Sequence, residues 1–115
     1  MSGEKIVEIA VSNDYSIIKF FAYVDVSTIE KARPTIKGKL PEESPIIVID
    51  LSDTEFLDSH GIGFFVSLLK KAHALNGQMF FMGAHDQPAA VLKMVGFNES
   101  LVNYCNNIDE VKKSL

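Results

Sequence analysis

The fold of this chain is decided by IIVIDLSDTEFLDSHGIG, residues 46–63. Residues 46–51 show almost no polar alternation, which predicts a central strand covered on both faces. The stretch from 62 to 75 is amphipathic and predicts a helix with one core-facing side. Its apolar residues recur at helical spacing: Ile62, Phe65, Val66, Leu69 and Ala72. A buried strand therefore passes into a helix, and Ser59 lies at the junction.

The residues before this junction predict a hairpin and a helix. Two β-like runs, residues 5–12 and 15–24, flank an Asn-Asp turn and predict antiparallel strands. The pattern Ser-Thr-Ile-Glu at 27–30 is a capping box and predicts a helix that runs toward Gly38. Pro34 lies inside this helix and predicts a kink or an early end.

The residues after the junction predict two more strands and two more helices. Residues 79–82 form a short apolar strand, and Asp86 is expected to cap a helix that runs to Gly96. Residues 101–105 predict a weak edge strand, and a last short helix begins at residue 107 or 108. The order ββαβαβαβα predicts an α/β fold, with a mixed, mostly parallel sheet of about five strands and about four helices. We expect residues 1–115 to form a single domain.

Composition limits the classes of function. The chain has 115 residues, a formal net charge of −4 and 47% hydrophobic residues, as expected of one globular domain. The negative charge and the lack of a basic cluster argue against nucleic-acid binding. The single cysteine, Cys105, excludes an internal disulfide and a CxxC metal pattern. No segment predicts a secretion signal or a bilayer span, so we expect a cytoplasmic protein without direct membrane insertion.

Ser59 is the candidate functional residue. At the start of a helix several backbone N–H groups lack intrahelical partners, and the helix dipole favours negative charge. A serine hydroxyl at this point is placed to carry a phosphate, which the free N–H groups would hold. Asp58, directly before it, is expected to cap the helix or to neighbour the cap.

Enzymatic interpretations of the same segment fail on geometry. Neighbouring residues at a helix start point about 100° apart, so His60 is not placed to take a proton from Ser59. Leu57 stands where a Gly-x-Ser-x-Gly nucleophile elbow requires glycine. The pair Gly61-x-Gly63 lacks the third glycine of a dinucleotide fingerprint, and the three histidines lack metal-ligand spacing. We expect no enzymatic activity, no metal and no cofactor.

The helix after Ser59 also carries candidate contacts with a partner. Phe64 and Leu68 lie off its main apolar stripe, and they either pack on a neighbouring helix or form an exposed apolar patch beside Ser59. His85, in a later loop, either lines the same surface or is solvated. The candidate partner-binding residues are Ile62, Gly63, Phe64, Leu68 and His85.

These features together resemble the STAS domain, in particular the stand-alone anti-sigma-factor antagonists of bacterial sporulation and general-stress pathways. The resemblance covers nearly the whole chain and rests on four segments: residues 46–52, residues 56–63, Asn76-Gly77 and residues 91–96. Its most specific part is Asp-Ser-x-Gly-Ile-Gly after an apolar strand. The fold implied by the resemblance is the one predicted above.

In that family the serine directly after the aspartate is the phosphoacceptor, which implies this role for Ser59. Its implied neighbours are Asp25, Asp58, His60 and Gly61. The family usually has Ser or Thr after the phosphoacceptor, and His60 here removes a second acceptor. The family's Gly-x-(Leu/Ile)-Asp segment reads Ala-Tyr-Val-Asp at 22–25. The aspartate is kept and the glycine is lost, so Asp25 is expected at the same end of the sheet as Ser59.

The resemblance implies a partner switch. The unphosphorylated antagonist would bind an anti-sigma factor that is also a serine protein kinase of the histidine-kinase-like ATPase fold, and so free the sigma factor. Phosphorylation of Ser59 would end that binding, and a metal-dependent serine phosphatase would reset it. Two alternatives stay open. One is a scaffold or subunit of a transport or stressosome-like assembly in which Ser59 is never phosphorylated, and the other is a switch whose output is not a sigma factor.

Overall fold

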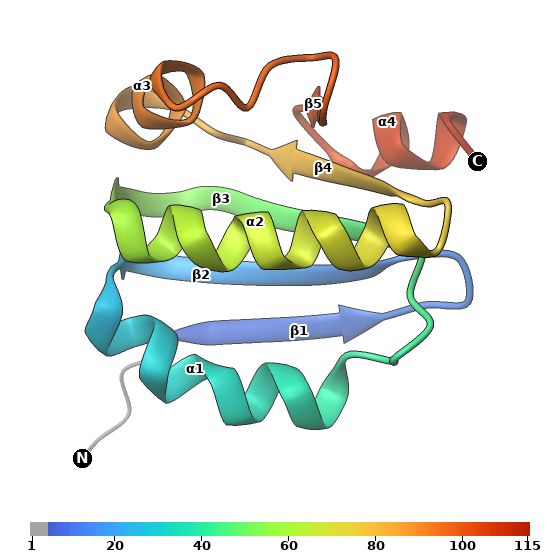
Figure 1. The fold of residues 1–115 in the computed structure, drawn as a ribbon, viewed down its shortest axis with the longest axis horizontal. Helices are drawn as coiled ribbons and strands as arrows, with labels where there is room; N and C mark the ends of the chain where they lie inside the picture. Colours follow the sequence, from blue (N-terminus) through green and yellow to red (C-terminus); the bar gives the residue numbers. More distant parts are fainter. Residues whose placement is uncertain (1–4) are drawn as a thin grey trace.

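Five strands form one mixed sheet in the order β1-β2-β3-β4-β5 (Figure 1). The computed structural model describes residues 5–115. The strands are β1 (Val7–Val11), β2 (Ser16–Val24), β3 (Ile46–Leu57), β4 (Gln78–Met82) and β5 (Asn103–Cys105). The helices are α1 (Val26–Lys39), α2 (Ser59–Ala74), α3 (Asp86–Met94) and α4 (Ile108–Lys113). The predicted order ββαβαβαβα is confirmed, and with it the α/β fold.

The connections bring the starts of the helices to one edge of the sheet. β1 and β2 form the predicted antiparallel hairpin, whereas β2, β3, β4 and β5 pair in parallel. Parallel neighbours require a crossover, and here each crossover contains a helix. The carboxyl ends of β2 and β3 therefore lie at the same edge, and α1 and α2 both begin there.

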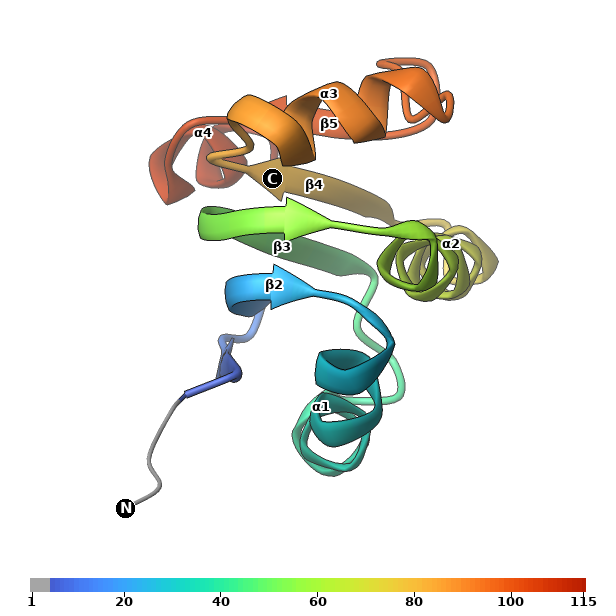
Figure 2. The ribbon, with the colours of Figure 1, turned by 90° about the vertical axis from the view of Figure 1, so that its left-hand side faces the viewer.

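The sheet is covered on both faces. α1 and α2 lie on one face, and α4 lies on the other, next to β4 and β5 (Figure 2). Under α2, the ring of Phe65 lies between those of Phe20 and Phe81, with centroids 5.9 and 5.4 Å away. On the other face, Val48 of β3 packs in a smaller cluster with Val111 of α4, and both are fully buried. The prediction of a central strand covered on both sides is confirmed.

β3 is longer than the sequence pattern predicts. It continues beyond Leu51 to Leu57, and this second half pairs with β2 through two shifts in register. Thr54, which is fully buried, donates its hydroxyl proton to the carbonyl of Phe20 at 3.0 Å. The prediction that the strand ends at Leu51 is wrong. The residues after Leu51 include polar side chains typical of a loop, but pairing with β2 keeps them in the strand.

α1 begins earlier than the predicted capping box. Its N-cap is Asp25, whose carboxylate accepts from the backbone N–H of Thr28 at 3.0 Å. The hydroxyl of Thr28 in turn accepts from the backbone N–H of Asp25 at 2.8 Å. The box predicted at Ser27 and Glu30 is therefore wrong. β2 ends at Val24, so the next residue is the first that can cap the helix.

Pro34 does not end α1. The helix continues through it to Lys39, so the predicted early end is wrong. A proline cannot donate to the carbonyl four residues earlier, which is that of Glu30. Both residues are exposed, so water can bond the carbonyl that Pro34 leaves free.

Candidate functional site

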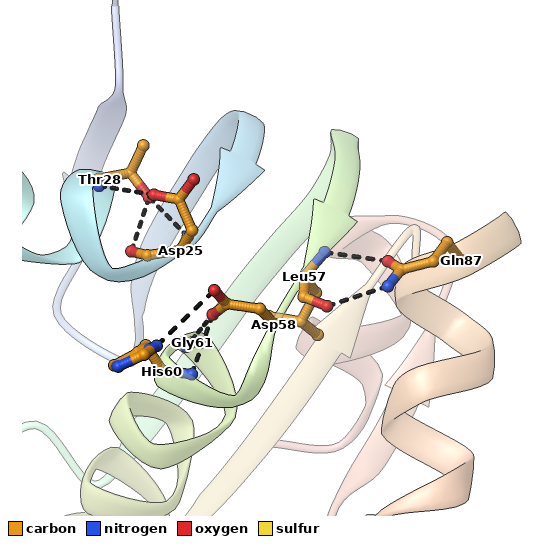
Figure 3. Close-up of polar contacts among 7 residues, drawn as sticks. All are labelled: Asp25, Thr28, Leu57, Asp58, His60, Gly61 and Gln87. Atoms are coloured by element: carbon orange, nitrogen blue, oxygen red, sulfur yellow. Dashed lines mark hydrogen bonds and ion pairs between the residues drawn. The ribbon is translucent and has the colours of Figure 1, made fainter.

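Two helices begin next to each other at the carboxyl edge of the sheet (Figure 3). β2 and β3 pair at their last residues, Val24 and Leu57. The backbone N–H of Asp58 also donates to the carbonyl of Val24 at 3.1 Å. The next residue of each strand caps a helix, Asp25 for α1 and Asp58 for α2. Asp25 therefore lies at the same end of the sheet as Ser59, as expected.

The Asp58 carboxylate occupies the start of α2. Its Oδ1 atom accepts from the backbone N–H groups of His60 at 2.9 Å and of Gly61 at 3.2 Å. The prediction that Asp58 caps the helix is confirmed. The expectation of several free N–H groups that would hold a phosphate is wrong, because the carboxylate already binds two of them. A negative charge thus occupies the positive end of the helix dipole.

Ser59 is the first residue of α2 and is exposed to solvent. Within residues 5–115 no hydrogen bond engages its hydroxyl, whereas the hydroxyls of Ser52 and Ser67 are both bonded. A modifying enzyme could therefore reach the Ser59 oxygen without unfolding the protein. Among the described residues, the same oxygen has no hydrogen-bonding role in the fold.

His60 turns toward the cap rather than toward the serine. Its Nδ1 atom lies 3.7 Å from Oδ2 of Asp58, and 59% of its side chain is exposed. No hydrogen bond joins His60 to Ser59 in the part of the chain that the structure describes. His60 is therefore not placed to act as a general base for Ser59. A protonated His60 ring would offset part of the charge of the Asp58 carboxylate.

The two glycines of this segment have different surroundings. A Cβ on Gly61 would lie 2.5 Å from Cδ1 of Leu57 and 2.8 Å from Cγ1 of Val24, so only glycine lets α2 start this close to the strands. A Cβ on Gly63 would have no heavy atom within 4 Å. Gly63 instead leaves a bare, exposed stretch of backbone one turn after Ser59.

The candidate partner-binding residues of α2 divide into two sets. Phe64 and Leu68 are only 7% and 5% exposed. The Phe64 ring packs edge-on against Phe20, with centroids 6.4 Å apart, and the Arg33 guanidinium lies over it. The hypothesis that Phe64 and Leu68 form an exposed patch beside Ser59 is therefore wrong, because both pack toward α1 and the sheet. Ile62 is half-buried and Gly63 is exposed, so these two remain on the surface near Ser59.

Comparison with known proteins settles the family. Residues 7–111 match the sequence profile of the STAS domain. The chain belongs to the STAS domain family.

Relatives of this STAS domain include the anti-sigma-B factor antagonist of Staphylococcus aureus (strain NCTC 8325 / PS 47). It is 19% identical over 93 residues, which cover 81% of this chain and 86% of that protein. An anti-sigma-factor antagonist (STAS) domain protein from Planctomyces limnophilus superposes with a TM-score of 0.81 at 16% identity, covering 97% of this chain and 98% of that one. The phosphorylated form of the Bacillus cell fate determinant SpoIIAA superposes with a TM-score of 0.72 at 15% identity, covering 95% of this chain and 99% of that one. These likenesses confirm the STAS fold.

His85 is bonded to the middle of β3. Its Nε2 atom lies 3.0 Å from the carbonyl oxygen of Ser52, and its Nδ1 atom lies 2.7 Å from Oδ2 of Asp86. Both neighbours are acceptors, so they favour a ring protonated on both nitrogens. The hydrogen bond to Asp86, followed by that to Ser52, raises the pKa of His85. His85, not Asp86, is the N-cap residue of α3, so the prediction that Asp86 caps this helix is wrong.

Gln87 contacts the β3–α2 junction and was not predicted from the sequence. Its side-chain Oε1 accepts from the N–H of Leu57 at 2.9 Å, and its Nε2 donates to the carbonyl of Leu57 at 3.0 Å (Figure 3). β4 ends at Met82, so this amide takes the place of a neighbouring strand at the end of β3. Gln87 therefore fixes the backbone two residues before Ser59. No local pattern around Gln87 indicates this contact.

Within residues 5–115 no three His, Cys, Asp or Glu side chains gather as metal ligands. Cys105 is buried, and burial is the main cause that raises the pKa of its thiol to about 11. No helix in the described part of the chain is long and apolar enough to cross a membrane.

Proposed function

We propose that this STAS domain is a cytoplasmic partner switch controlled by phosphorylation of Ser59. The unphosphorylated chain binds an anti-sigma factor that is also a serine kinase, and phosphorylation releases it. The observation that carries the proposal is the position of Ser59: it is exposed, its hydroxyl has no hydrogen bond within residues 5–115, and it lies next to the capping carboxylate of Asp58. The protein acts by binding, not by catalysis.

The local charges support release on phosphorylation. A phosphate on Ser59 would add about −1.5 to −2 charges. Asp58 already holds the N–H groups of His60 and Gly61, so the phosphate would compete with a carboxylate for them. Asp25 adds a further negative charge at the same edge of the sheet. This edge of the sheet would become strongly anionic at Ser59, where the partner is proposed to bind.

The size of the effect is sufficient for a switch. Burying an unpaired charge in a partly dry interface costs several kcal/mol. A loss of about 3 kcal/mol of binding free energy already lowers affinity about 100-fold. The fold tolerates the modification because Ser59 is exposed and its hydroxyl bonds nothing within residues 5–115.

The first experiment identifies the partner and the modified residue. The chain would be used to capture partners from its native cells, followed by mass spectrometry and an ATP-dependent phosphorylation assay. We expect a kinase of the histidine-kinase-like ATPase fold, phosphate on Ser59, and removal of that phosphate by a metal-dependent serine phosphatase. Capture of transporter or stressosome-type subunits without phosphate on Ser59 would select the scaffold alternative. A phosphorylated Ser59 with a different downstream protein would select a switch with another output.

The second experiment measures affinity for that partner by calorimetric titration. Ser59→Ala should bind but resist phosphorylation, and phosphorylated protein should bind about 100-fold or more weakly. Ser27 offers a matched control, because it is an exposed serine in the first turn of the neighbouring helix. Ser27→Asp should leave affinity within about threefold. Equal affinity of the phosphorylated and unphosphorylated chains would contradict the proposal.

A further inference from the structure

A groove runs between α1 and α2. These two helices lie on the same face of the sheet (Figure 1). It has a volume of about 460 Å³. Its floor is apolar and is formed by Ile36, Leu40, Phe64 and Leu68. Phe64 and Leu68 are the α2 residues that lie off the main apolar stripe. Their packing against α1 leaves this groove rather than an exposed patch.

The rim of the groove is basic. Arg33 and Lys37 come from α1 and Lys71 from α2, against a single acidic residue, Glu42. Within residues 5–115 none of these three cations takes part in an ion pair. The local excess is about two positive charges, in a chain whose net charge is −4. Three unpaired cations above an apolar floor are complementary to an anion that carries an apolar tail.

Arg33 is already held in place over the floor. Its Cζ atom lies 5.3 Å from the centroid of the Phe64 ring, within the range of a cation–π contact. A guanidinium that is fixed before a ligand arrives loses less side-chain entropy on binding. Its planar fork can donate two parallel hydrogen bonds to a phosphate or carboxylate.

Helix dipoles do not account for this cluster. Lys37 and Lys71 lie in the last turns of α1 and α2, where cations are favourable. Arg33 lies near the middle of α1, beyond the reach of that effect. The dipoles also give no reason for cations from two helices to line one groove.

We propose that this groove binds a single-chain amphiphile with a phosphate monoester head group. The chain would run along the groove over the small parts of Phe64 and Leu68 that remain exposed, and the head group would meet Arg33, Lys37 and Lys71. A phosphate monoester carries about −1.5 to −2 charges, which matches the local excess better than a carboxylate does. The volume is in the range of small-molecule sites, about 300–1,000 Å³.

This site is separate from the proposed switch. The groove residues of α2 begin one turn beyond Ser59, and none of residues 58–61 lines the groove. Ligand binding should therefore be the same in Ser59→Ala, whatever the outcome of the phosphorylation experiments. A negative result at either site leaves the other proposal standing.

The test titrates the full chain with dodecyl phosphate, kept below its critical micelle concentration, by calorimetry and by amide NMR shifts. We expect saturable binding of one molecule, with shifts centred on α1 and the second half of α2. The double variant Lys37→Gln/Lys71→Gln should bind about tenfold or more weakly, since each charged hydrogen bond contributes. Lys31→Gln/Lys70→Gln removes the same charge from exposed positions outside the groove and should change affinity less than about twofold.

Four probes define the ligand chemistry. Inorganic phosphate should bind far more weakly than dodecyl phosphate, because it lacks the chain. Dodecyl maltoside has the chain without the charge and should also bind weakly. Dodecanoate should bind more tightly than these two probes and more weakly than dodecyl phosphate. Its affinity relative to dodecyl phosphate separates a fatty-acid carboxylate from a phosphate head group. Equal losses in both double variants, equal binding of dodecyl maltoside, or no saturable binding would each overturn the proposal.

Discussion

Gly61 of α2 lies directly against Val24 of β2, so closely that a Cβ on Gly61 would be 2.8 Å from Val24 Cγ1 and 3.0 Å from the Val24 carbonyl oxygen. The carbonyl is part of the backbone and also accepts the N–H of Asp58. It cannot move without breaking that bond. This contact holds the start of α2, and with it Ser59, at the edge of the sheet.

Gly61→Ala should therefore destabilise the protein by about 1–3 kcal/mol, as overpacking does in a close-packed interior. Gly63→Ala is the matched control, because it is on the same helix with open space around it. It should be neutral or stabilise by up to about 1 kcal/mol, since alanine is the better helix former. Urea denaturation measures both free energies of unfolding. Equal effects of the two substitutions would contradict the steric argument.

Ala22 occupies a backbone conformation that suits glycine. Its φ is +60°, and the residue is exposed. A left-handed conformation costs an L-residue roughly 1–2 kcal/mol, part of which is offset by the lower entropy of the unfolded alanine chain. Ala22→Gly should thus raise the free energy of unfolding by about 0.5–1 kcal/mol. Glycine adopts the conformation of Ala22 without this strain.

Ala10 provides the control for that substitution, because it is an exposed alanine in β1 with an ordinary backbone conformation. Ala10→Gly should lower the free energy of unfolding by about 0.5–1 kcal/mol, since glycine weakens a strand. Changes of opposite sign in the free energy of unfolding at the two positions, measured in the same denaturant series, identify the backbone conformation as the cause. A loss of stability in Ala22→Gly would refute it.

The fold was predictable because its signal is local. Residues 46–51 form a nearly continuous apolar run, the stripe of α2 has a helical period, and turn residues separate the elements. The second half of β3 was not predictable, since its polar residues are held by pairing with β2, including the bond from Thr54 to Phe20. Long-range pairing leaves no local pattern in the sequence. The same holds for the contact between Gln87 and Leu57.

The candidate site was predictable in position but not in detail. The Asp-Ser-x-Gly segment after a buried strand places Ser59 at a helix start, and the structure has it there. Spacing alone does not determine which acceptors take hydrogen bonds from the N–H groups at the helix start. The Asp58 side chain competes with any ligand for these N–H groups. The burial of Phe64 likewise depends on Phe20 and Arg33, which are distant in sequence.

Asp58 should determine how much a phosphate on Ser59 disturbs the fold. Asp58→Asn keeps a capping oxygen and removes the charge. In the unphosphorylated protein it should therefore change the free energy of unfolding by no more than about 0.5 kcal/mol. Phosphorylation of Ser59 should then destabilise the protein by about 0.5–1 kcal/mol less in Asp58→Asn than in the wild type. Denaturation of the four species forms a double-mutant cycle. Asp25→Asn, at the cap of the neighbouring helix, should give a smaller coupling energy with the phosphate on Ser59. If the effects of Asp58→Asn and of phosphorylation on the free energy of unfolding are strictly additive, repulsion between Asp58 and the phosphate is excluded.

His85 should titrate above the ordinary value for histidine, because its ring donates to Asp86 and to the carbonyl of Ser52. A pKa raised in the folded state means that the protonated ring stabilises the fold at low pH. That contribution is complete below about pH 6.5 and is lost as the pH rises through the folded-state pKa. An NMR titration should show the raised pKa, and Asp86→Asn should lower it. Asp109→Asn, on α4, should leave it unchanged, and an unaltered pKa in Asp86→Asn would contradict the assignment.

Cys105 should be an unreactive thiol in the folded protein. Burial is the main cause of its raised pKa of about 11, with smaller contributions from Glu110 and Asp50. Relative to an ordinary cysteine, the thiolate fraction in neutral buffer falls about 100-fold, and reactivity follows the thiolate. The rate of reaction with a disulfide reagent should therefore rise at least about 100-fold when urea unfolds the chain. In the native protein the rate should keep increasing about tenfold per pH unit well beyond the range where a free thiol levels off. Equal native and unfolded rates would show that the thiol is accessible and ionised, which is incompatible with its burial beside Val111 and Phe80.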